Sequence, residues 1–536
     1  MFKKIILLFS ILILTVSVWA KDIIIYHTTD IHGHYFSRQD KQGKDFGGFA
    51  RFAGILKDTK QPYLLLDSGD FSSGSYEANI SGGKYSIDLM NKTGYTALTI
   101  GNHDSDFGDE GLGKMLSGFR GDILAMNVSD FNIPKKQVKP HAIYKVGGIK
   151  VGVIGVAMDG SGSGRIKIVN SPSVQDFEDQ IQELKEKGSE VIIILAHDSL
   201  LSNDEISIDK KSNILENISQ TPSLGYVSLV LGGHAHTQAL LGQITNMEGK
   251  GPWVLEDGPY LESISKTIIH KDKKTGKITV KEPEFIRLEG KEDKKINKYL
   301  NTIQAKELDD TIYAKVPVLI TKYPSLAQKD RAPAVARMMA EQMYESIKPF
   351  EKIDLAAFSL KSTRSDYQPG DLTGRYFAEM APYEEHSGTF NISGKHLKRA
   401  MLESIGYRDG QCFSVYGYSD NVHINFSCND GKPELRIVKI NGKELDIKAT
   451  YRMAMLTHLP RGFYEGKPFQ IMPSDAVDDG TVIKHYKDIT VASLLFGIIE
   501  KAKETQGKDI PDFIAPSGVQ IKEISAKLKI QNKKVK

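Results

Sequence analysis

The chain of 536 residues is poor in cysteine and carries little net charge: it has two cysteines, Cys412 and Cys428, and a formal charge of +3. Two cysteines exclude a small disulfide-dense scaffold, and without a Cys-x-x-Cys spacing they do not predict a thiolate metal site. In an exported chain the pair could form a disulfide; the alternative is two unpaired buried thiols. The nearly neutral charge disfavours nucleic acid polymers and membrane surfaces as partners.

Long apolar runs are also absent after residue 20, so no stable membrane anchor is expected in the rest of the chain. Lys3 and Lys4 precede an apolar run over residues 5–18, and a Val-Trp-Ala triplet follows that ends at Ala20. This order is typical of a secretory signal peptide, residues 1–20, cleaved after Ala20. The alternative is a membrane anchor, but a span needs about 20 apolar residues, more than this run supplies. The sequence therefore predicts a secreted or periplasmic protein.

Short strands dominate the apolar pattern of the first half. They are rich in β-branched residues and apolar on both faces, which is typical of strands covered on both sides by other layers. Helix-like stretches lie between them, so we expect an α/β fold with helices flanking sheets. The predicted strands are residues 23–26, 63–66, 97–100, 151–154, 191–195 and 227–231, and the predicted helices are 48–57, 85–93 and 174–187.

A chain of this length exceeds one hydrophobic core, and its composition changes in the middle. Residues 291–308 are charged and helical, and prolines punctuate the segment that follows. We place the domain junction between residues 288 and 330 and expect a second, α+β region after it. Its expected elements are a helix over residues 331–347 and strands over 353–358, 422–426, 435–440 and 451–456.

Potential metal ligands follow five of the six predicted strands of the first half. If these strands are parallel neighbours, their carboxyl ends place those side chains at one edge. Seven donors are too many for one tetrahedral ion with an open position, and they suit two ions that share a bridging carboxylate. Oxygen and nitrogen donors without thiolate favour Zn, Mn, Fe or Co. The candidate ligands are Asp30, His32, Asp70, Asn102, His197, His234 and His236.

Each of these motifs alone also fits a surface turn or a structural histidine, and only their joint occurrence favours a site. Their order, Asp-x-His, Gly-Asp, Gly-Asn-His-Asp, His and Gly-His-x-His, resembles the signature of the calcineurin-like metallophosphoesterases. The fuller pattern is similar to the 5'-nucleotidase branch of that family. It comprises Phe-Gly-Gly-Phe-Ala-Arg at 46–51, Asp-Leu-Met-Asn-Lys-Thr-Gly-Tyr at 88–95, the octet at 101–108, and looser matches at 392–397 and 440–446.

The resemblance implies a two-domain organisation. An α/β/β/α metallophosphoesterase sandwich is expected over residues 21–288, and a linker region with a helix over 289–330. A smaller α+β, 5'-nucleotidase-like domain that binds the substrate is expected over residues 331–536.

The resemblance also implies a role for each candidate. Asp30, His32 and His236 would hold one ion; Asn102, His197 and His234 would hold the other; Asp70 would bridge both. A hydroxide bridging the ions would attack phosphorus in line with the leaving alcohol. His103 would stabilise the phosphoryl charge or protonate the leaving oxygen, and Asp106 would orient its ring. The alternative for Asp106 is a helix cap, and His27 and His34 could line the site.

The expected nucleoside-binding motifs depart from the family pattern. Arg364 is kept from an Asn-Gly-Gly-x-x-Arg-like loop, but the glycines are lost and Ser359 replaces the asparagine. Glycines there would let the backbone approach a ligand closely, so their loss changes the pocket. Candidate stacking residues are Phe413 or Tyr416 and Phe463 or Tyr464; the alternative is that these aromatics belong to the core or the rim.

The sequence thus predicts a secreted, two-metal hydrolase of phosphate monoesters, 5'-nucleotidase-like and acting on nucleotides as small-molecule partners. One alternative is a hydrolase of another small phospho- or sulfo-ester: a thiosulfohydrolase-like enzyme, or one acting on sugar nucleotides or cyclic nucleotides. The altered nucleoside loop keeps these open. The other alternative is a secreted, non-enzymatic binding protein on the same scaffold, which the complete set of ligands disfavours.

Overall fold

A computed structural model describes most of the chain beyond the expected signal peptide, which lies outside the described residues. Arg364, Phe463 and Tyr464 also lie outside them. The described residues are 22–40, 42–128, 137–158, 172–200, 213–245, 249, 251–310, 312–316, 334–362, 370–380, 385–408, 411–429, 431–457, 482–495, 497–498 and 520–523. Within them, no helix combines the length and the apolar character that crossing a bilayer requires.

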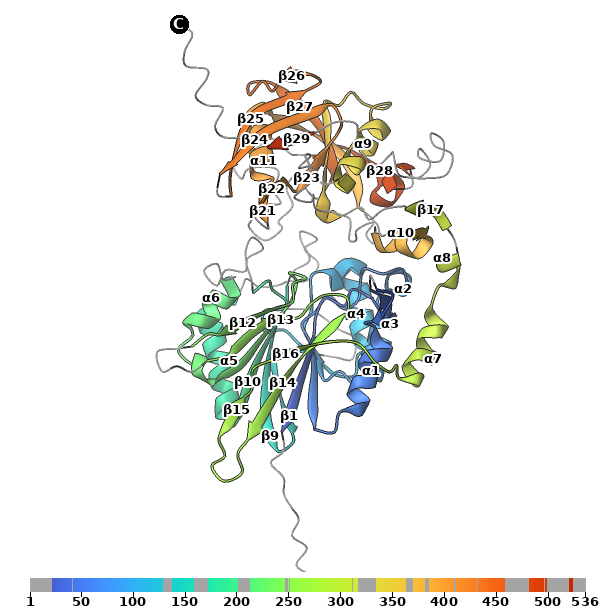
Figure 1. Ribbon diagram of the computed structural model, residues 1–536. Coiled ribbons are helices and arrows are strands. Elements are labelled where there is room, and N and C mark those ends of the chain that lie inside the picture. The colour runs from blue at the N-terminus through green and yellow to red at the C-terminus, as the bar shows by residue number, and fades with distance from the viewer. Residues whose placement is uncertain are drawn as a thin grey trace, which may run out of the picture.

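Two sheets face each other in the N-terminal half (Figure 1). The eight-stranded sheet has the order β15-β14-β1-β4-β5-β6-β7, with β16 paired to β14. Its strands are β1 (Ile23–Thr28), β4 (Tyr63–Asp67), β5 (Ala97–Leu98), β6 (Asp122–Leu124), β7 (Val138–Lys139), β14 (Ser263–Lys271), β15 (Ile278–Val280) and β16 (Glu284–Arg287). The six-stranded sheet has the order β12-β13-β11-β10-β9-β8. Its strands are β8 (His141–Val146), β9 (Ile149–Val156), β10 (Val191–Ala196), β11 (Val227–Gly232), β12 (Ala239–Gln243) and β13 (Trp253–Glu256).

Alternation along the strands explains why they are apolar on both faces. Ile23 and Ile25 of β1 pack into the core between the sheets, whereas Ile24 and Tyr26 face the helices. Helices α1 (Phe49–Asp58), α3 (Lys84–Thr93), α4 (Gly108–Ser117) and α7 (Lys294–Ile303) cover the first sheet, and α5 (Val174–Glu186) and α6 (Asn213–Gln220) cover the second (Figure 1). The predicted α/β/β/α sandwich is confirmed.

Parallel pairing brings the carboxyl ends of the central strands to one edge of the sandwich. Strand β1 pairs in parallel with β4, and β4 with β5; in the other sheet β10 pairs in parallel with β9 and β11. The third predicted strand, residues 97–100, is shorter than expected, because β5 ends at Leu98 and the chain turns toward the ligand loop.

The C-terminal half has a core of its own, formed from residues between Val335 and Ile498. A five-stranded sheet, β23-β18-β27-β20-β28, and a four-stranded sheet, β26-β25-β24-β29, pack with helices α9 (Ala334–Ile347) and α11 (Gly394–Glu403). The strands are β18 (Leu355–Ser359), β20 (His386–Ser393), β23 (Tyr416–Tyr418), β24 (Val422–Asn429), β25 (Lys432–Ile440), β26 (Lys443–Glu444), β27 (Thr450–Leu456), β28 (Val482–Thr490) and β29 (Ile521–Glu523). This is the smaller α+β unit that the sequence predicts.

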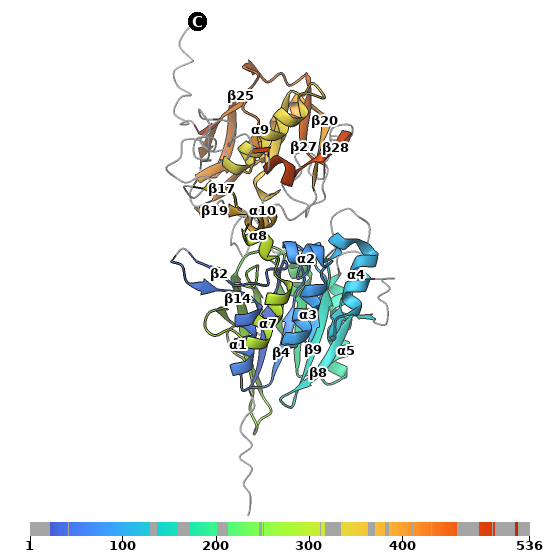
Figure 2. The same cartoon turned by 90° about the vertical axis from the view of Figure 1, so that its right-hand side faces the viewer.

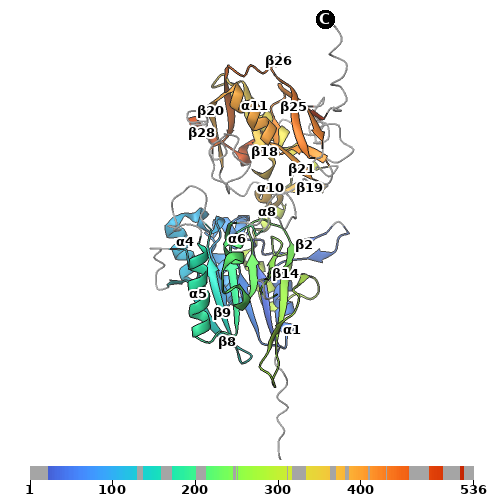
Figure 3. The same ribbon diagram turned by 90° about the vertical axis from the view of Figure 1, so that its left-hand side faces the viewer.

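Short elements connect the two halves: α8 (Lys306–Asp310) and α10 (Gly374–Met380) lie between them, as Figures 2 and 3 show. Glu77 of α2 (Tyr76–Ile80) is fully buried and accepts hydrogen bonds from the Ala305 amide at 3.0 Å and from Nη1 of Arg375 at 2.9 Å. The Arg375 guanidinium also lies 5.2 Å from the ring centre of Phe36. Because a buried carboxylate needs such partners, this pair anchors α10 to the N-terminal half.

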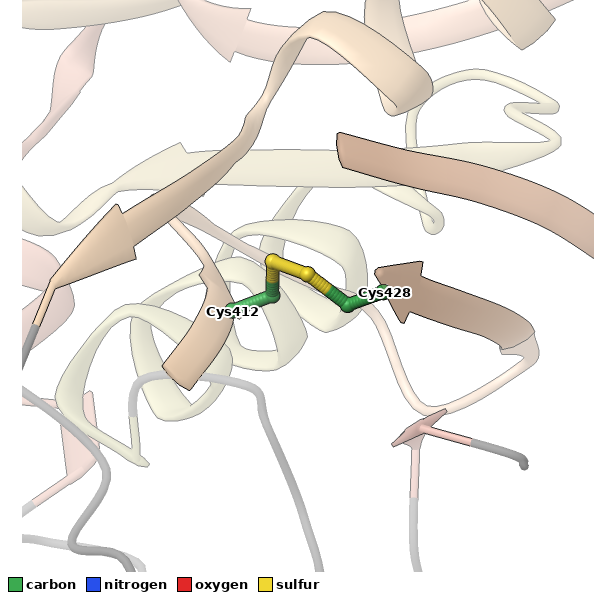
Figure 4. The surroundings of a disulfide bond; sticks show 2 residues. All are labelled: Cys412 and Cys428. Atoms are coloured by element: carbon green, nitrogen blue, oxygen red, sulfur yellow. A yellow bond between two sulfur atoms is a disulfide. The ribbon is translucent and has the colours of Figure 1, made fainter. Parts of the chain in front are cut away.

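A disulfide joins Cys412 of β22 (Gln411–Ser414) to Cys428 of β24 (Figure 4). The two residues are 16 apart in sequence, and Cys412 is buried in the C-terminal core. The structure therefore favours the bridged alternative over two free thiols.

Removing this bridge should destabilise the C-terminal half. For a loop of this length the unfolded chain gains conformational freedom equivalent to about 3 kcal/mol. We expect the Cys412→Ala/Cys428→Ala variant to lose about that much free energy of unfolding in urea, in the transition of the C-terminal half. Dithiothreitol should lower the wild-type midpoint and leave the variant unchanged. Equal stability of the two proteins without reductant would contradict the bridge.

Candidate metal centre

All seven predicted ligands meet at the edge where the central strands end. Asp30 and His32 follow β1, Asp70 follows β4 and Asn102 follows β5. From the second sheet, His197 follows β10, and His234 and His236 follow β11. The two sheets thus contribute to one site, although the residues lie up to about 200 positions apart in the chain.

A first group of donors consists of Asp30, His32 and His236. Oδ1 of Asp30 lies 3.9 Å from Nε2 of His32 and 3.5 Å from Nε2 of His236, and the two ring nitrogens are 2.9 Å apart. Asp30 is fully buried, and its Oδ1 has no hydrogen-bond partner among the described residues. A buried carboxylate oxygen without a donor is costly, and a cation between these three atoms would satisfy it.

A second group consists of Asp70, Asn102, His197 and His234. Nε2 of His197 lies 3.2 Å from Oδ2 of Asp70 and 3.2 Å from Oδ1 of Asn102, which lies 2.8 Å from Nδ1 of His234. Oδ2 of Asp70 is also 3.6 Å from Nε2 of His32, a member of the first group. One carboxylate oxygen therefore lies within reach of both groups, the position that a bridging ligand requires.

Backbone carbonyls orient two of the histidine rings. Nδ1 of His32 donates to the carbonyl of Ser73 at 2.7 Å, and Nδ1 of His197 donates to the carbonyl of Ser68 at 2.7 Å. A proton on Nδ1 leaves Nε2 as the electron-pair donor, and in both rings Nε2 is the atom that faces the other ligands.

The electrostatics of the site favour positive charge at its centre. Burial raises the pKa of Asp30 to about 6. Burial opposes ionisation of Asp70 as well, but the charge of His197 outweighs it and holds the pKa of Asp70 well below its usual value. Burial likewise lowers the pKa of His197, but Asp70 overcomes this and raises it to about 10. Without a metal ion, the charge of Asp70 is thus balanced by a proton on His197. A bound cation would supply the same positive charge in place of that proton.

Backbone strain is concentrated here. Eight non-glycine residues of the described chain have positive φ angles, a conformation that L-amino acids rarely adopt. Only Asn441 lies outside the centre; the others are Asp30, His32, Asp70, His234, His236, Tyr260 and Leu261. Such strain is typical of sites where side chains must converge from turns.

Tyr260 is a residue that the sequence analysis missed. Its amide donates to the carbonyl of Asp30 at 2.8 Å, and its ring centre lies 5.4 Å from that of His236 and 4.3 Å from that of His34. The Arg38 guanidinium lies 5.1 Å from the same ring centre. Tyr260 follows β13 in a Gly-Pro-Tyr turn, and a strand prediction there would have pointed to the turn.

Asp104 was also without a predicted role. It is fully buried and accepts hydrogen bonds from the amides of Asp70, Phe71, Ser72 and Gly101 at 2.9–3.1 Å, and from the Ser72 hydroxyl at 2.7 Å. It therefore fixes the loop after β4 against the loop after β5, which places Asp70 opposite Asn102.

The two histidines beside the first motif differ. His34 reaches the rim of the centre through Tyr260. His27 does not line the site, contrary to the expectation: it is fully buried, and its Nε2 lies 2.8 Å from the Ser68 hydroxyl. Burial lowers the pKa of His27 to about 3, so it stays neutral.

His103 and Asp106 form a pair at the mouth of the centre. Nδ1 of His103 lies 3.0 Å from Oδ2 of Asp106, and the His103 amide donates to Oδ1 of Asp70 at 2.7 Å. Both residues lie within the 3-10 helix His103–Phe107; Asn102 occupies its N-cap position, and Phe107 occupies that of the next helix. Asp106 is therefore no helix cap, and its carboxylate instead accepts hydrogen bonds from the His103 ring and from the Ser73 hydroxyl.

Of the predicted substrate-binding residues, Phe413 lies within the described part of the chain, as does its alternative Tyr416. Phe413 and Tyr416 are 6% and 1% exposed and belong to the C-terminal core, which supports the core alternative for both. Ser359, the residue at the expected asparagine position, is buried at the end of β18.

Comparisons with known proteins agree with this geometry. A family model for calcineurin-like phosphoesterases matches residues 23–238, and one for the 5'-nucleotidase C-terminal domain matches residues 315–470. The chain is 26% identical over 508 residues to the NAD 5'-nucleotidase of Haemophilus influenzae, an alignment that covers 79% of this chain and 81% of that protein.

Two solved structures, both from Thermus thermophilus, show the same fold. A 5'-nucleotidase precursor has a TM-score of 0.72 at 19% identity, and the match covers 94% of this chain and 99% of that one. The sulfate thiohydrolase SoxB has a TM-score of 0.65 at 14% identity, with 94% and 97% covered.

Divalent cations should stabilise the folded protein through these groups. A ligand at 100 times its dissociation constant adds about 2.7 kcal/mol of stability. We expect Mn²⁺ or Zn²⁺ to raise the melting temperature of chelator-treated protein, and Asp70→Asn to reduce that shift because it removes the shared carboxylate. Asp257→Asn is the matched control: Asp257 is a buried aspartate outside both groups, and burial raises its pKa to about 7. An equal shift in all three proteins would contradict the assignment.

Proposed function

The chain belongs to the 5'-nucleotidase family, phosphoric ester hydrolases that use two divalent cations, and on that premise we propose that it is a secreted hydrolase of nucleoside monophosphates. The observation that carries the proposal is the position of Asp70, whose Oδ2 lies 3.2 Å from His197 and 3.6 Å from His32. A carboxylate shared by two donor groups beside an oriented histidine suits hydrolysis at phosphorus.

Side chains of the protein are proposed to bind the two cations and to donate a proton during the reaction. When bound, the two ions act as Lewis acids toward phosphoryl oxygens and lower the pKa of a water molecule. We assign Asp30, His32 and His236 to one ion, and the remaining donors to the other, with Asp70 shared. The seven side chains and their distances support this assignment.

His103 is proposed to act on the phosphoryl group. Because its Nδ1 is bonded to Asp106, Nε2 is the nitrogen that can donate to a phosphoryl oxygen or to the leaving alcohol. Its ring centre is 5.3 Å from that of His32, so the donor lies beside the first group.

The nucleotide preference rests on the family premise and on the named relatives. The proposed organisation is a signal peptide over 1–20, a catalytic domain over 21–288, a linker region over 289–330 and a substrate-binding domain over 331–536. Arg364 and one of Phe463 and Tyr464 are proposed to contact the nucleotide; Phe413, being buried, is not retained. Because the asparagine and glycines before Arg364 are lost, the substrate panel described below tests which phosphate ester is preferred.

Phosphate release should require both Asp70 and His103. We expect wild-type protein with Mn²⁺, Zn²⁺ or Co²⁺ to release phosphate from a nucleoside 5'-monophosphate. Loss of a positioned proton donor costs about 10²- to 10⁴-fold in rate, so His103→Ala should lower kcat/KM by that range while the bound metal is retained. Asp70→Asn should lower both activity and metal content. His270→Ala serves as a matched control. Nδ1 of His270 lies 2.7 Å from Oδ1 of Asp22, just before the amino end of β1, whereas the predicted ligands follow its carboxyl end.

The same assay separates the alternatives. A panel of nucleoside monophosphates, a sugar nucleotide, a cyclic nucleotide and an S-sulfonate (R–S–SO₃⁻) is measured for inorganic phosphate, for sulfate and, by chromatography, for nucleoside monophosphate formed from the sugar nucleotide or the cyclic nucleotide. Sulfate alone would identify a sulfo-ester hydrolase, and a nucleoside monophosphate without inorganic phosphate would identify a hydrolase of sugar nucleotides or cyclic nucleotides. No product of any kind from metal-loaded protein would support the binding protein.

A further inference from the structure

Ser73 lies in the loop between β4 and α2 and contacts two parts of the centre at once. Its carbonyl accepts the hydrogen bond from Nδ1 of His32 at 2.7 Å. Its hydroxyl donates to Oδ2 of Asp106 at 2.7 Å, the same oxygen that lies 3.0 Å from Nδ1 of His103. Ser73 itself is 2% exposed.

We infer that Ser73 is a positioning residue that holds Asp106, and through it His103, in register with the first metal ligand group. The inference rests on the proposed function, because it concerns the proton donor of that reaction. Ser73 would touch neither substrate nor metal.

The surrounding loop fixes Ser73 on both sides. On one side, Asp104 accepts the amides of Phe71 and Ser72, each at 3.1 Å. On the other, the Gly74 amide donates to Oδ1 of Asn79 at 3.2 Å. The backbone on both sides of Ser73 is therefore held by hydrogen bonds that do not involve His103 or Asp106. Ser73 can thus keep its position when the side chains of that pair move.

Gly74 shows that the contact with His32 needs a close approach of the backbone. A Cβ at Gly74 would lie 2.9 Å from Cβ of His32 and 3.2 Å from its Nδ1, and the φ angle there is +127°. Only glycine adopts this conformation without strain, and only glycine leaves room for the ring. The backbone thus packs closely against His32 at Gly74, next to the residue whose hydroxyl donates to Asp106.

Asp106 needs such a second donor because it is not enclosed. Its side chain is 32% exposed, whereas that of His103 is 14% exposed. A carboxylate that is bonded to one ring nitrogen can rotate toward water, and the ring then loses its orientation. Two donors on one oxygen, from Ser73 and His103, restrict that rotation.

The test compares leaving groups, because a donor to the leaving oxygen matters most when that oxygen is basic. With metal-loaded protein, p-nitrophenyl phosphate is the ester with a good leaving group, and a nucleoside 5'-monophosphate is the one with a poor leaving group. We expect Ser73→Ala to lower kcat/KM about tenfold for the nucleotide and less than about twofold for p-nitrophenyl phosphate, and Ser73→Thr to restore most of the loss. A hydrogen bond to a charged group is of a size that gives this effect.

Ser75→Ala is the matched control in the same loop. Ser75 is also buried, but its hydroxyl accepts from the Ala78 amide as the cap of α2 and donates to the Gly33 carbonyl at 2.7 Å. Loss of such a cap destabilises the helix that it begins. This variant should melt at a lower temperature while the ratio of the two kcat/KM values stays that of the wild type.

A double-mutant cycle shows whether Ser73 acts through Asp106. If it does, Ser73→Ala should add no further loss to Asp106→Ala. A second readout does not depend on activity: in protein labelled with ¹⁵N-histidine, the Nδ1 proton of His103 should be slow to exchange in the wild type and fast in Ser73→Ala.

The outcomes distinguish the two proposals. Hydrolysis by the wild type tests the proposed function; its absence for both esters would overturn that function and this inference together. With an active wild type, an unchanged ratio in Ser73→Ala, or losses that add in the double variant, would overturn the role of Ser73 alone.

Discussion

The buried carboxylate of Asp70 between two groups of imidazole nitrogens is the constraint around which the N-terminal half is organised. A charge at 1% exposure is tolerated only where cations or protonated rings surround it, and His197 and His32 come from different sheets. The sandwich must therefore bring the ends of both sheets together at one edge. Parallel pairing of β1 with β4, and of β10 with β11, accomplishes this.

Strained turns are the means by which short loops present these side chains. Five of the seven predicted ligands have positive φ angles, and Tyr260 and Leu261 share that conformation beside them. Each such residue costs of order 1 kcal/mol or more, which persists only where surrounding bonds determine it. Asp104 contributes to holding these turns, because it accepts hydrogen bonds from the amides of Asp70 and Gly101.

The sequence could reveal the role of a residue when that residue belongs to a local motif. It could not do so when the role depends on contacts with distant segments. Three central strands of each sheet, β1, β4 and β5 in one and β9, β10 and β11 in the other, follow from local apolar patterns. The seven candidate donors follow as well, since a polar residue soon after an apolar strand is visible in the sequence. Tyr260 and Ser73 act through contacts with segments far away in the chain, so no local pattern marked them. His27 has the same type of neighbours as His32, yet it points between the sheets, because alternate residues of β1 face opposite sides. The short β5 could not be foreseen either, since its end is set by the turn that carries Asn102.

The segment from Asp70 to Glu77 combines functions that the fold could have distributed over several loops. It carries the shared carboxylate, the serine that contacts Asp106, the cap of α2 and the buried glutamate that accepts bonds from Ala305 and Arg375. Because these residues are consecutive along one loop and one short helix, the contact between the two halves and the geometry of the centre share a single piece of backbone. The C-terminal half is thus attached, through Ala305 and Arg375, at the same segment that carries Asp70, the proposed shared ligand.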